Sequence, residues 1–123
     1  MEVTESINLH NMDDCTTVVL IKDKDGIPVA PYSNIDFKII YYTTPQYEYE
    51  ASRIDGILSN NCSISGDYIY VYIDGFDWGK LGRAYMKISV GWVNEHFPDG
   101  KENVSVVCLS AINVISPLQV NII

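Results

Sequence analysis

Apolar and polar residues alternate with a period of two along most of this chain, which is the pattern of strands with one buried face. In the clearest segment, apolar residues fall on one face and tyrosines on the other; they are Ile69, Val71 and Ile73, and Tyr68, Tyr70 and Tyr72. No stretch has helical periodicity over the length of an ordinary helix. The pattern predicts strands over residues 16–22, 35–41, 47–53, 57–64, 68–74, 84–92 and 103–114.

Asp-Gly pairs separate several of these strands, and they suit turns because glycine accepts a positive φ and aspartate can bond to its own local backbone. The pairs begin at Asp25, Asp55, Asp74 and Asp99. Residues 79–82, Gly-Lys-Leu-Gly, are predicted to form a single helical turn between two strands. About seven to eight short strands at this spacing are typical of an all-β fold, an antiparallel β-sandwich of immunoglobulin-like size. The Cys-Trp-Cys signature of true immunoglobulin domains is missing, so the prediction covers the architecture alone.

The chain has 123 residues, which is enough for one domain with its own core and too few for two. The pattern predicts a polar leader over residues 1–15, a β-sandwich domain over residues 16–116 and an apolar tail over residues 117–123. The acidic start, Met-Glu-Val-Thr-Glu, does not fit a signal peptide. No apolar run approaches the roughly 20 residues of a membrane helix, so we expect no membrane partner.

The last part of the chain is apolar: residues 103–123 carry no charged side chain, although the chain has 16 acids and 8 bases. A strand over residues 103–114 with an apolar tail behind it needs a cover, which either the same domain or another protein supplies. The tail is therefore our first candidate for an assembly contact. The tail residues expected at this interface are Leu118, Val120, Ile122 and Ile123.

The net charge of −8 at pH 7 argues against nucleic-acid binding, which needs clustered Lys and Arg to displace phosphate counterions. The three cysteines, Cys15, Cys62 and Cys108, lack the spacing and the histidine partners of a zinc site. We expect three reduced thiols, since disulfides are rare in proteins that are made and kept in a cytosol. The sequence predicts neither a metal nor a cofactor.

Candidate catalytic groups are few. The two histidines, His10 and His96, have no nucleophile placed beside them by a recognisable loop or elbow. The carboxylates of Asp13–Asp14 and of Glu48 and Glu50 have the composition of acid–base or metal sites. However, Glu48 and Glu50 share one strand face, which is typical of a solvated sheet edge. The sequence therefore predicts no enzyme.

The segment Asp23-Lys24-Asp25-Gly26 resembles the opening of a calcium-binding loop. Such a loop needs a third oxygen ligand before its glycine and a glutamate six residues after it. Here the glycine comes one position after Asp25, and Tyr32 stands where the glutamate is required. We interpret the segment as a hairpin turn.

Tyrosine is the most frequent aromatic residue, with nine copies in the chain. Tyr68, Tyr70 and Tyr72 line the outward face of one predicted strand. Three interpretations stay open: cross-strand pairing that stabilises the sheet, a protein interface in which tyrosine gives contact area at low entropic cost, and stacking against a sugar. We include the three tyrosines among the expected interface residues.

Several segments occur in an order that is shared with a known group of proteins: Ile7–Asp14, Asp36–Thr43, Tyr49–Arg53, Asn61-Cys62, and Phe97–Gly100 followed by a long last strand. In this order the chain resembles small structural proteins of tailed phages of gut Bacteroidetes, including the crAss-like phages. The similar segments cover most of the chain, and their order carries the resemblance because each motif alone is structural. The chain departs from the pattern at residues 76–81, where Phe-Asp-Trp-Gly-Lys-Leu stands in place of the usual Gly-Leu pair.

The resemblance implies a β-sandwich that serves as an adaptor or fibre base on the virion, attached to the capsid as a head-fibre protein or placed near the tail baseplate. Longer relatives carry a fibre or receptor-binding module after this domain. We therefore expect a non-enzymatic virion component, made in the host bacterial cytoplasm, that forms a dimer or trimer and contacts capsid or fibre subunits. The apolar tail would then dock on a neighbouring subunit, for example by strand addition. Two other hypotheses stay open: a small glycan-binding module, and a bacterial regulator or toxin-system partner.

Overall fold

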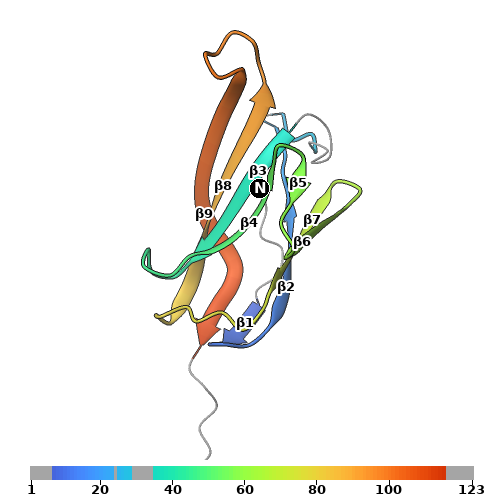
Figure 1. Ribbon diagram of the computed structural model, residues 1–123. Coiled ribbons are helices and arrows are strands. Elements are labelled where there is room, and N and C mark those ends of the chain that lie inside the picture. The colour runs from blue at the N-terminus through green and yellow to red at the C-terminus, as the bar shows by residue number, and fades with distance from the viewer. Residues whose placement is uncertain (1–6, 24, 29–34, 116–123) are drawn as a thin grey trace, which may run out of the picture.

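The computed structural model describes residues 7–23, 25–28 and 35–115 of the chain (Figure 1). This part contains nine strands and no helix, so the predicted all-β class is confirmed. The strands are β1 (Ile7–His10), β2 (Cys15–Leu20), β3 (Ile35–Tyr42), β4 (Tyr49–Ile54), β5 (Ile57–Leu58), β6 (Cys62–Ser65), β7 (Tyr68–Ile73), β8 (Gly82–Val93) and β9 (Lys101–Ile115). The helical turn predicted for residues 79–82 is wrong. Gly79 and Gly82 have φ values of 74° and 122°, which a right-handed helix does not allow.

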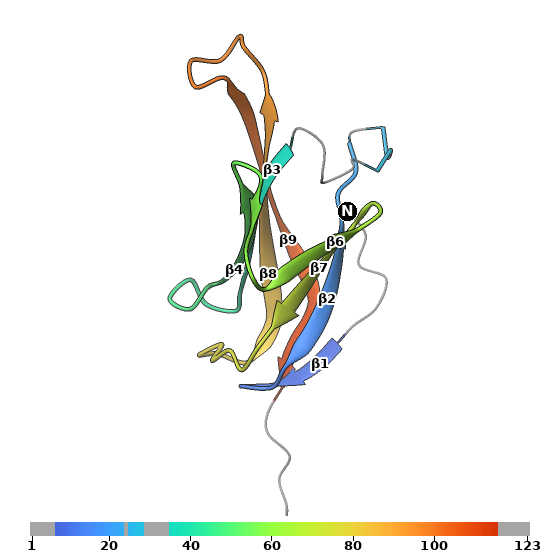
Figure 2. The ribbon, with the colours of Figure 1, turned by 45° about the vertical axis from the view of Figure 1, so that its right-hand side comes forward.

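The strands form two sheets that face each other (Figures 1 and 2). The larger sheet has six strands in the order β1-β9-β8-β3-β4-β5, and the smaller has three in the order β2-β7-β6. All paired strands are antiparallel except β1 and β9, which run parallel. The prediction of a purely antiparallel arrangement is therefore wrong at this pair. β1 and β9 are far apart in the sequence, so no hairpin fixes their relative direction.

Strand β1 lies inside the segment that the sequence predicts as a leader. Its residues Ile7–His10 pair with Ile112–Ile115 of β9, and the Leu9 side chain is only 4% exposed. This segment thus supplies one strand to the large sheet and one side chain to the core. The alternation Ile-Asn-Leu-His is only four residues long, which is the lower limit at which a pattern identifies a strand.

The predicted strand over residues 57–64 is two short strands in different sheets. β5 pairs with β4 in the large sheet, whereas β6 pairs with β7 in the small one. Ser59 fixes the crossing between them, because its N–H donates to the Ser52 carbonyl at 2.8 Å and its hydroxyl accepts the Ser52 N–H at 3.0 Å. Residue periodicity alone does not show such a change of sheet.

The core lies between the two sheets, and its residues follow the predicted alternation. The buried faces of the longer strands are Ile35, Phe37, Ile39 and Tyr41 in β3, Ile69, Val71 and Ile73 in β7, and Ala84, Met86, Ile88 and Val90 in β8. Trp78, in the loop between β7 and β8, is fully buried and packs edge-on against Phe76. Tyr49 of β4 extends this cluster, and its hydroxyl donates to the Tyr72 carbonyl at 2.6 Å. That hydrogen bond links the large sheet to the small one.

The two longest strands form a hairpin that extends beyond the small sheet, as its orange end shows in Figure 1. β8 has 12 residues and β9 has 15, whereas β2 and β7 have 6 each. A six-residue strand is too short to cover a hairpin of this length. Inward-facing residues of β9 therefore change from buried at Ile112 and Val114 to half-exposed at Val104 and Val106.

Candidate functional site

An open strand edge is the main candidate for a functional surface. Strand β9 pairs with β8 on one side, but on its other side β1 covers only Ile112–Ile115. Within the described part of the chain, no strand lies beside Asn103–Leu109, and we call this stretch the β9 edge. Its four apolar side chains are about half-exposed: Val104 at 50%, Val106 at 51%, Val107 at 53% and Leu109 at 50%. The sequence predicts that this apolar strand is covered, but no described residue covers the β9 edge.

The β9 edge is apolar on both faces of the sheet. Val104 and Val106 point to the inner side, and Val107 and Leu109 to the outer side, as their partners on β8 do. On the inner side a shallow groove of about 120 Å³ runs beside the edge. It is lined by Ile21, Lys22, Ile88, Val90, Trp92, Val104 and Val106. An apolar groove next to an open strand suits another extended chain segment, which can fill the groove and pair with the backbone.

The tail residues that the sequence predicts at an interface lie outside the described residues. These are Leu118, Val120, Ile122 and Ile123. Their expected role as interface residues stays a prediction.

The predicted tyrosine face lies on the outer side of the small sheet, and its orientation is confirmed. Tyr68 is 46% exposed, Tyr72 is 44% exposed and Tyr70 is half-buried. Tyr70 lies between Val18 of β2 and Ser63 of β6, and the Tyr72 hydroxyl is 2.8 Å from the Ser63 hydroxyl. The cross-strand neighbours of Tyr70 are thus an aliphatic and a hydroxyl side chain. Pairing between aromatic rings therefore does not explain the tyrosine face.

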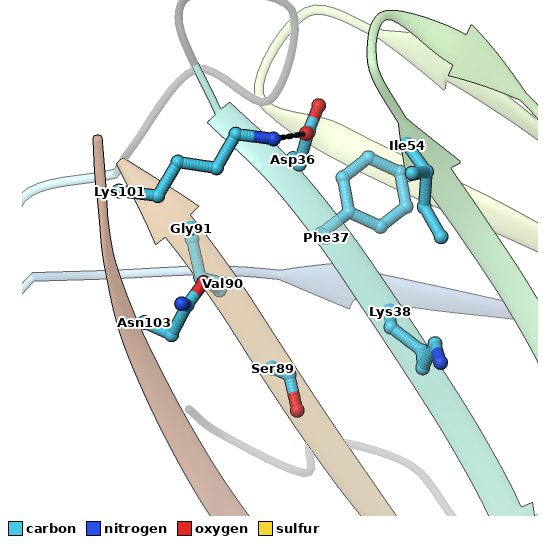
Figure 3. Close-up of a pocket in the computed structure, with 9 residues that line it drawn as sticks. All are labelled: Asp36, Phe37, Lys38, Ile54, Ser89, Val90, Gly91, Lys101 and Asn103. Atoms are coloured by element: carbon cyan, nitrogen blue, oxygen red, sulfur yellow. Dashed lines mark hydrogen bonds and ion pairs between the residues drawn. The ribbon is translucent and has the colours of Figure 1, made fainter. Parts of the chain in front are cut away.

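A polar hollow of about 190 Å³ opens on the outer face of the large sheet (Figure 3). At one end the Lys101 ammonium group donates to Asp36 at 2.8 Å and to Asp55 at 3.2 Å. The hydrogen bond from Lys101 lowers the pKa of Asp36 below its ordinary value, so this carboxylate stays ionised. The hollow lies where Gly91 has no side chain, and Asn103 Oδ1 lies 2.8 Å from the position that a Cβ on Gly91 would take. Through these two ion pairs Lys101, at the start of β9, connects to β3 and to the turn after β4.

Sequence reasoning missed this ion-pair cluster. Asp36, Asp55 and Lys101 come from β3, the turn after β4 and the start of β9, and no local spacing connects them. Only the register of the large sheet brings them together.

The two histidines do not form a shared site. His10, the last residue of β1, has its Nδ1 3.7 Å from Asp13 Oδ2. His96 lies in the tip of the β8–β9 hairpin, where its backbone N–H donates to the Asn94 side chain. The tip and β1 are at opposite ends of the molecule (Figure 1).

Three other acidic residues, Glu50, Asp14 and Asp74, have structural partners. Glu50 forms an ion pair with Lys38 at 3.2 Å across two neighbouring strands. Asp14 accepts the Gly75 N–H at 2.8 Å, and a hydrogen bond between the side chains of Asp14 and Asp74 raises the pKa of Asp74. No group of three or more His, Cys, Asp or Glu side chains that could hold a metal ion occurs among the residues with a described position.

The hairpin turn predicted at Asp23 is confirmed. Its carboxylate accepts the backbone N–H groups of Asp25 and Ile27 at 2.9 Å and 3.0 Å, and Lys22 and Pro28 form an antiparallel bridge across the turn. A carboxylate that accepts two local N–H groups shapes a turn.

The three cysteines are free thiols in the structure. Cys62 is buried, whereas Cys15 and Cys108 are partly exposed. Burial raises the pKa of Cys15 and of Cys108, which keeps both thiols protonated and weakly nucleophilic at neutral pH.

Comparison of the chain with protein-family models, with curated proteins and with solved structures finds no match in any of the three. No helix that could span a membrane occurs in residues 7–23, 25–28 and 35–115.

Proposed function

We propose that this chain is a non-enzymatic structural subunit that joins other proteins through the β9 edge. The observation that carries this proposal is the β9 edge, which has half-exposed apolar residues on both faces and, among the described residues, no paired strand on the side away from β8. The resemblance to structural proteins of Bacteroidetes phages suggests the assembly in which the subunit acts. There it is a capsid-attached head-fibre or fibre-base adaptor of the virion.

Covering the β9 edge would stabilise an assembly. Full burial of a valine or leucine side chain contributes about 1.5–3 kcal/mol relative to full exposure. Val104, Val106, Val107 and Leu109 keep about half of their exposure, so covering each one contributes roughly 1 kcal/mol. Backbone hydrogen bonds along the edge add about 1 kcal/mol each. Together these contributions can offset an association entropy that costs on the order of 4–15 kcal/mol.

The sequence of the β9 edge lacks the usual protection against unwanted pairing. Exposed edge strands are commonly guarded by lysine, proline, inward-pointing charges or bulges. Between Asn103 and Leu109 there is no charged residue and no proline. An apolar edge of this kind is expected to have a partner in the assembled state.

The proposal includes an immunoglobulin-like sandwich of the variable type. It is supported by the strand order, since β9-β8-β3-β4-β5 corresponds to the G-F-C-C′-C″ sheet of such domains and β2-β7-β6 to B-E-D. Strand β1 corresponds to strand A, the first strand of such domains. It pairs with β9 in the large sheet, whereas strand A belongs to the sheet of B, E and D.

The proposed partners are further copies of this chain, in a dimer or trimer, together with capsid or fibre subunits. The proposed location is the virion, after synthesis in the host bacterial cytoplasm. No catalytic group, metal, cofactor, nucleic acid or membrane is part of the proposed mechanism. The subunit acts by presenting the apolar β9 edge on its double sheet.

Purified virions of the phage that encodes this chain provide the test. We expect mass spectrometry to find peptides of the chain in gradient-purified particles, and antibodies against the full chain to place gold label on the head. A non-structural phage protein that is expressed at the same stage serves as the control for contamination. Label on the tail would favour a baseplate or tail-fibre adaptor, and absence of the chain from the particles would contradict the proposal.

A second candidate function is a small glycan-binding module. It is favoured by the tyrosine face, where Tyr68 and Tyr72 are nearly half-exposed beside Ser63 and Ser65. Tyrosine rings stack on sugars, and hydroxyl groups hydrogen-bond to them. If this function holds, a saccharide array should show selective binding that Tyr68→Ala and Tyr72→Ala abolish. Binding that is unchanged in both variants would exclude this face.

A further inference from the structure

We propose that the β9 edge accepts residues Leu118–Ile122 of a second copy of this chain as an added β-strand. This inference rests on the proposed function, because it names the partner of the same surface. Three observations support the inference. They are the direction of the unpaired N–H and C=O groups of the β9 edge, the side-chain patterns of the edge and of Leu118–Ile122, and the distance that the chain can span after Ile115.

The turn of the β8–β9 hairpin fixes the direction of the backbone groups of β9. The Asn94 N–H donates to the Gly100 carbonyl at 2.8 Å, so these residues form a hydrogen-bonded pair. Hydrogen-bonded and non-hydrogen-bonded pairs alternate along an antiparallel ladder. Counting from Gly100 along the register shows which residues direct N–H and C=O away from β8. Within the β9 edge they are Asn103, Ser105, Val107 and Leu109.

These open groups form the row of donors and acceptors to which an added strand binds. No described residue donates to or accepts from this row. The row spans about 20 Å from Asn103 to Leu109 at roughly 3.3 Å per residue, so an incoming segment of five residues, about 13 Å from its first to its last residue, pairs with about two thirds of it.

The apolar face of the tail matches the inner face of the β9 edge. Leu118, Val120 and Ile122 alternate with Gln119 and Asn121, so the segment has one apolar and one polar face in extended form. We place the apolar face on the inner side of the sheet, where it continues the half-exposed valines and fills the groove. The amide face then lies on the outer side, near the hydroxyl pair formed by Ser89 and Ser105 at 2.9 Å.

Leu118 lies too close to Ile115 along the chain for the tail to cover the β9 edge of its own copy. Strand β9 ends at Ile115, and Leu109 lies six residues back, about 20 Å along the strand at roughly 3.3 Å per residue. The three residues from Ile115 to Leu118 span at most about 11 Å when fully extended, which falls short of Leu109. They would also have to pass around β1, which occupies the side of Ile112–Ile115. A segment that begins at Leu118 is therefore too short of reach to pair with the full β9 edge of its own molecule.

A second copy is the partner because both complementary segments belong to this chain. Each copy carries a net charge of −8, which opposes close approach of two copies. Residues 103–123 hold no charged side chain, so both the edge and the tail avoid this repulsion at the contact. An unrelated partner would need a matching uncharged strand of its own.

The test uses two full-length variants, each of which disables one half of the contact. Val107→Pro removes an N–H that points to the open edge and leaves the bonds to β8 in place, whereas Val107→Thr keeps that N–H and the β-branched shape as its matched control. Val120→Asp places a charge in the donor segment. Light scattering and sedimentation velocity at matched concentrations report the assembly state.

We expect the unmodified chain and Val107→Thr to form dimers or trimers, and Val107→Pro and Val120→Asp to be monomers. A mixture of the two monomeric variants should recover assembly, because the first supplies an intact tail and the second an intact edge. If Val107→Pro loses the far-ultraviolet dichroism of the folded chain, Val107→Lys replaces it, since an exposed charge blocks an edge without disturbing the ladder.

The inference is overturned if the unmodified chain is a monomer, if the edge variant assembles like the unmodified chain, or if the mixture stays monomeric. These results are independent of the virion analysis. A monomer that is found in virions overturns this inference and leaves the proposed function in place. A chain that complements in the mixture but is absent from virions overturns the proposed function alone.

Discussion

Ser110→Ala tests how β9 is anchored at the point where its buried end meets its open edge. Ser110 is 1% exposed and lies where the register between β8 and β9 shifts. Its hydroxyl donates to the Ala84 carbonyl at 2.8 Å and accepts the Ile112 N–H at 3.1 Å. Both backbone groups lie in the irregular part of the ladder, so this single side chain completes the pairing that the register shift interrupts.

The alanine variant leaves two buried backbone groups without this partner. Each buried donor or acceptor that loses its hydrogen bond costs about 1–3 kcal/mol. Relaxation of the strand recovers part of this loss, so we expect the free energy of unfolding to fall by roughly 2–4 kcal/mol. That is a large share of the 5–15 kcal/mol that typically stabilises a domain.

Urea unfolding followed by tryptophan fluorescence measures the effect, because Trp78 is fully buried. For a slope of about 2 kcal/mol per molar urea, the midpoint should fall by about 1–2 M at fixed protein concentration. Ser105→Ala is the matched control on the same strand, since it removes an exposed hydroxyl that pairs only with Ser89, and it should change the stability by less than about 0.5 kcal/mol. Equal midpoints for Ser110→Ala and Ser105→Ala would refute the argument.

Two further predictions concern contacts between sheets and strands. Tyr49→Phe removes the hydroxyl that links β4 to the Tyr72 carbonyl and should lower the free energy of unfolding by about 1 kcal/mol, measured by urea unfolding; a loss above roughly 3 kcal/mol would show that the ring packing has also changed. Asp36→Asn removes a carboxylate whose pKa Lys101 lowers, and such a group contributes stability at neutral pH that is lost as the pH falls through its folded-state pKa. The urea midpoint of the unmodified chain should therefore exceed that of Asp36→Asn at pH 6, and the difference should shrink below pH 3.8, the ordinary pKa of this group. A difference that is constant from pH 6 to pH 3 would contradict this assignment.

Much of the fold can be predicted from local patterns in the sequence. The alternation in β3, β7 and β8 identifies the buried faces, because a strand with one face in the core must place its apolar residues two apart. The four Asp-Gly pairs coincide with turns, and Gly26, Gly56, Gly75 and Gly100 all have positive φ values between 56° and 80°. These features depend on a few neighbouring residues, so the sequence contains all the information they need.

Contacts between distant segments could not be predicted in the same way. The parallel pairing of β1 with β9, the crossing at Ser59 and the cluster around Lys101 join residues that no repeat or spacing connects. The candidate site has the same limitation. The uncharged last strand indicates that a cover is needed, but which residues stay open depends on how far β1 and the small sheet extend along β9.

The sequence by itself determined an all-β chain, the inward and outward faces of its main strands, the positions of its tight turns and an uncharged C-terminal region. These properties follow from local sterics and from the period of two, which act within a few residues. Only the tertiary structure decided that Val104, Val106, Val107 and Leu109 form an open edge while Ile112 and Val114, on the same strand, are buried. The physical reason is that the cover of a strand depends on the lengths and register of its neighbours, and these are fixed only when segments far apart in the sequence pack together.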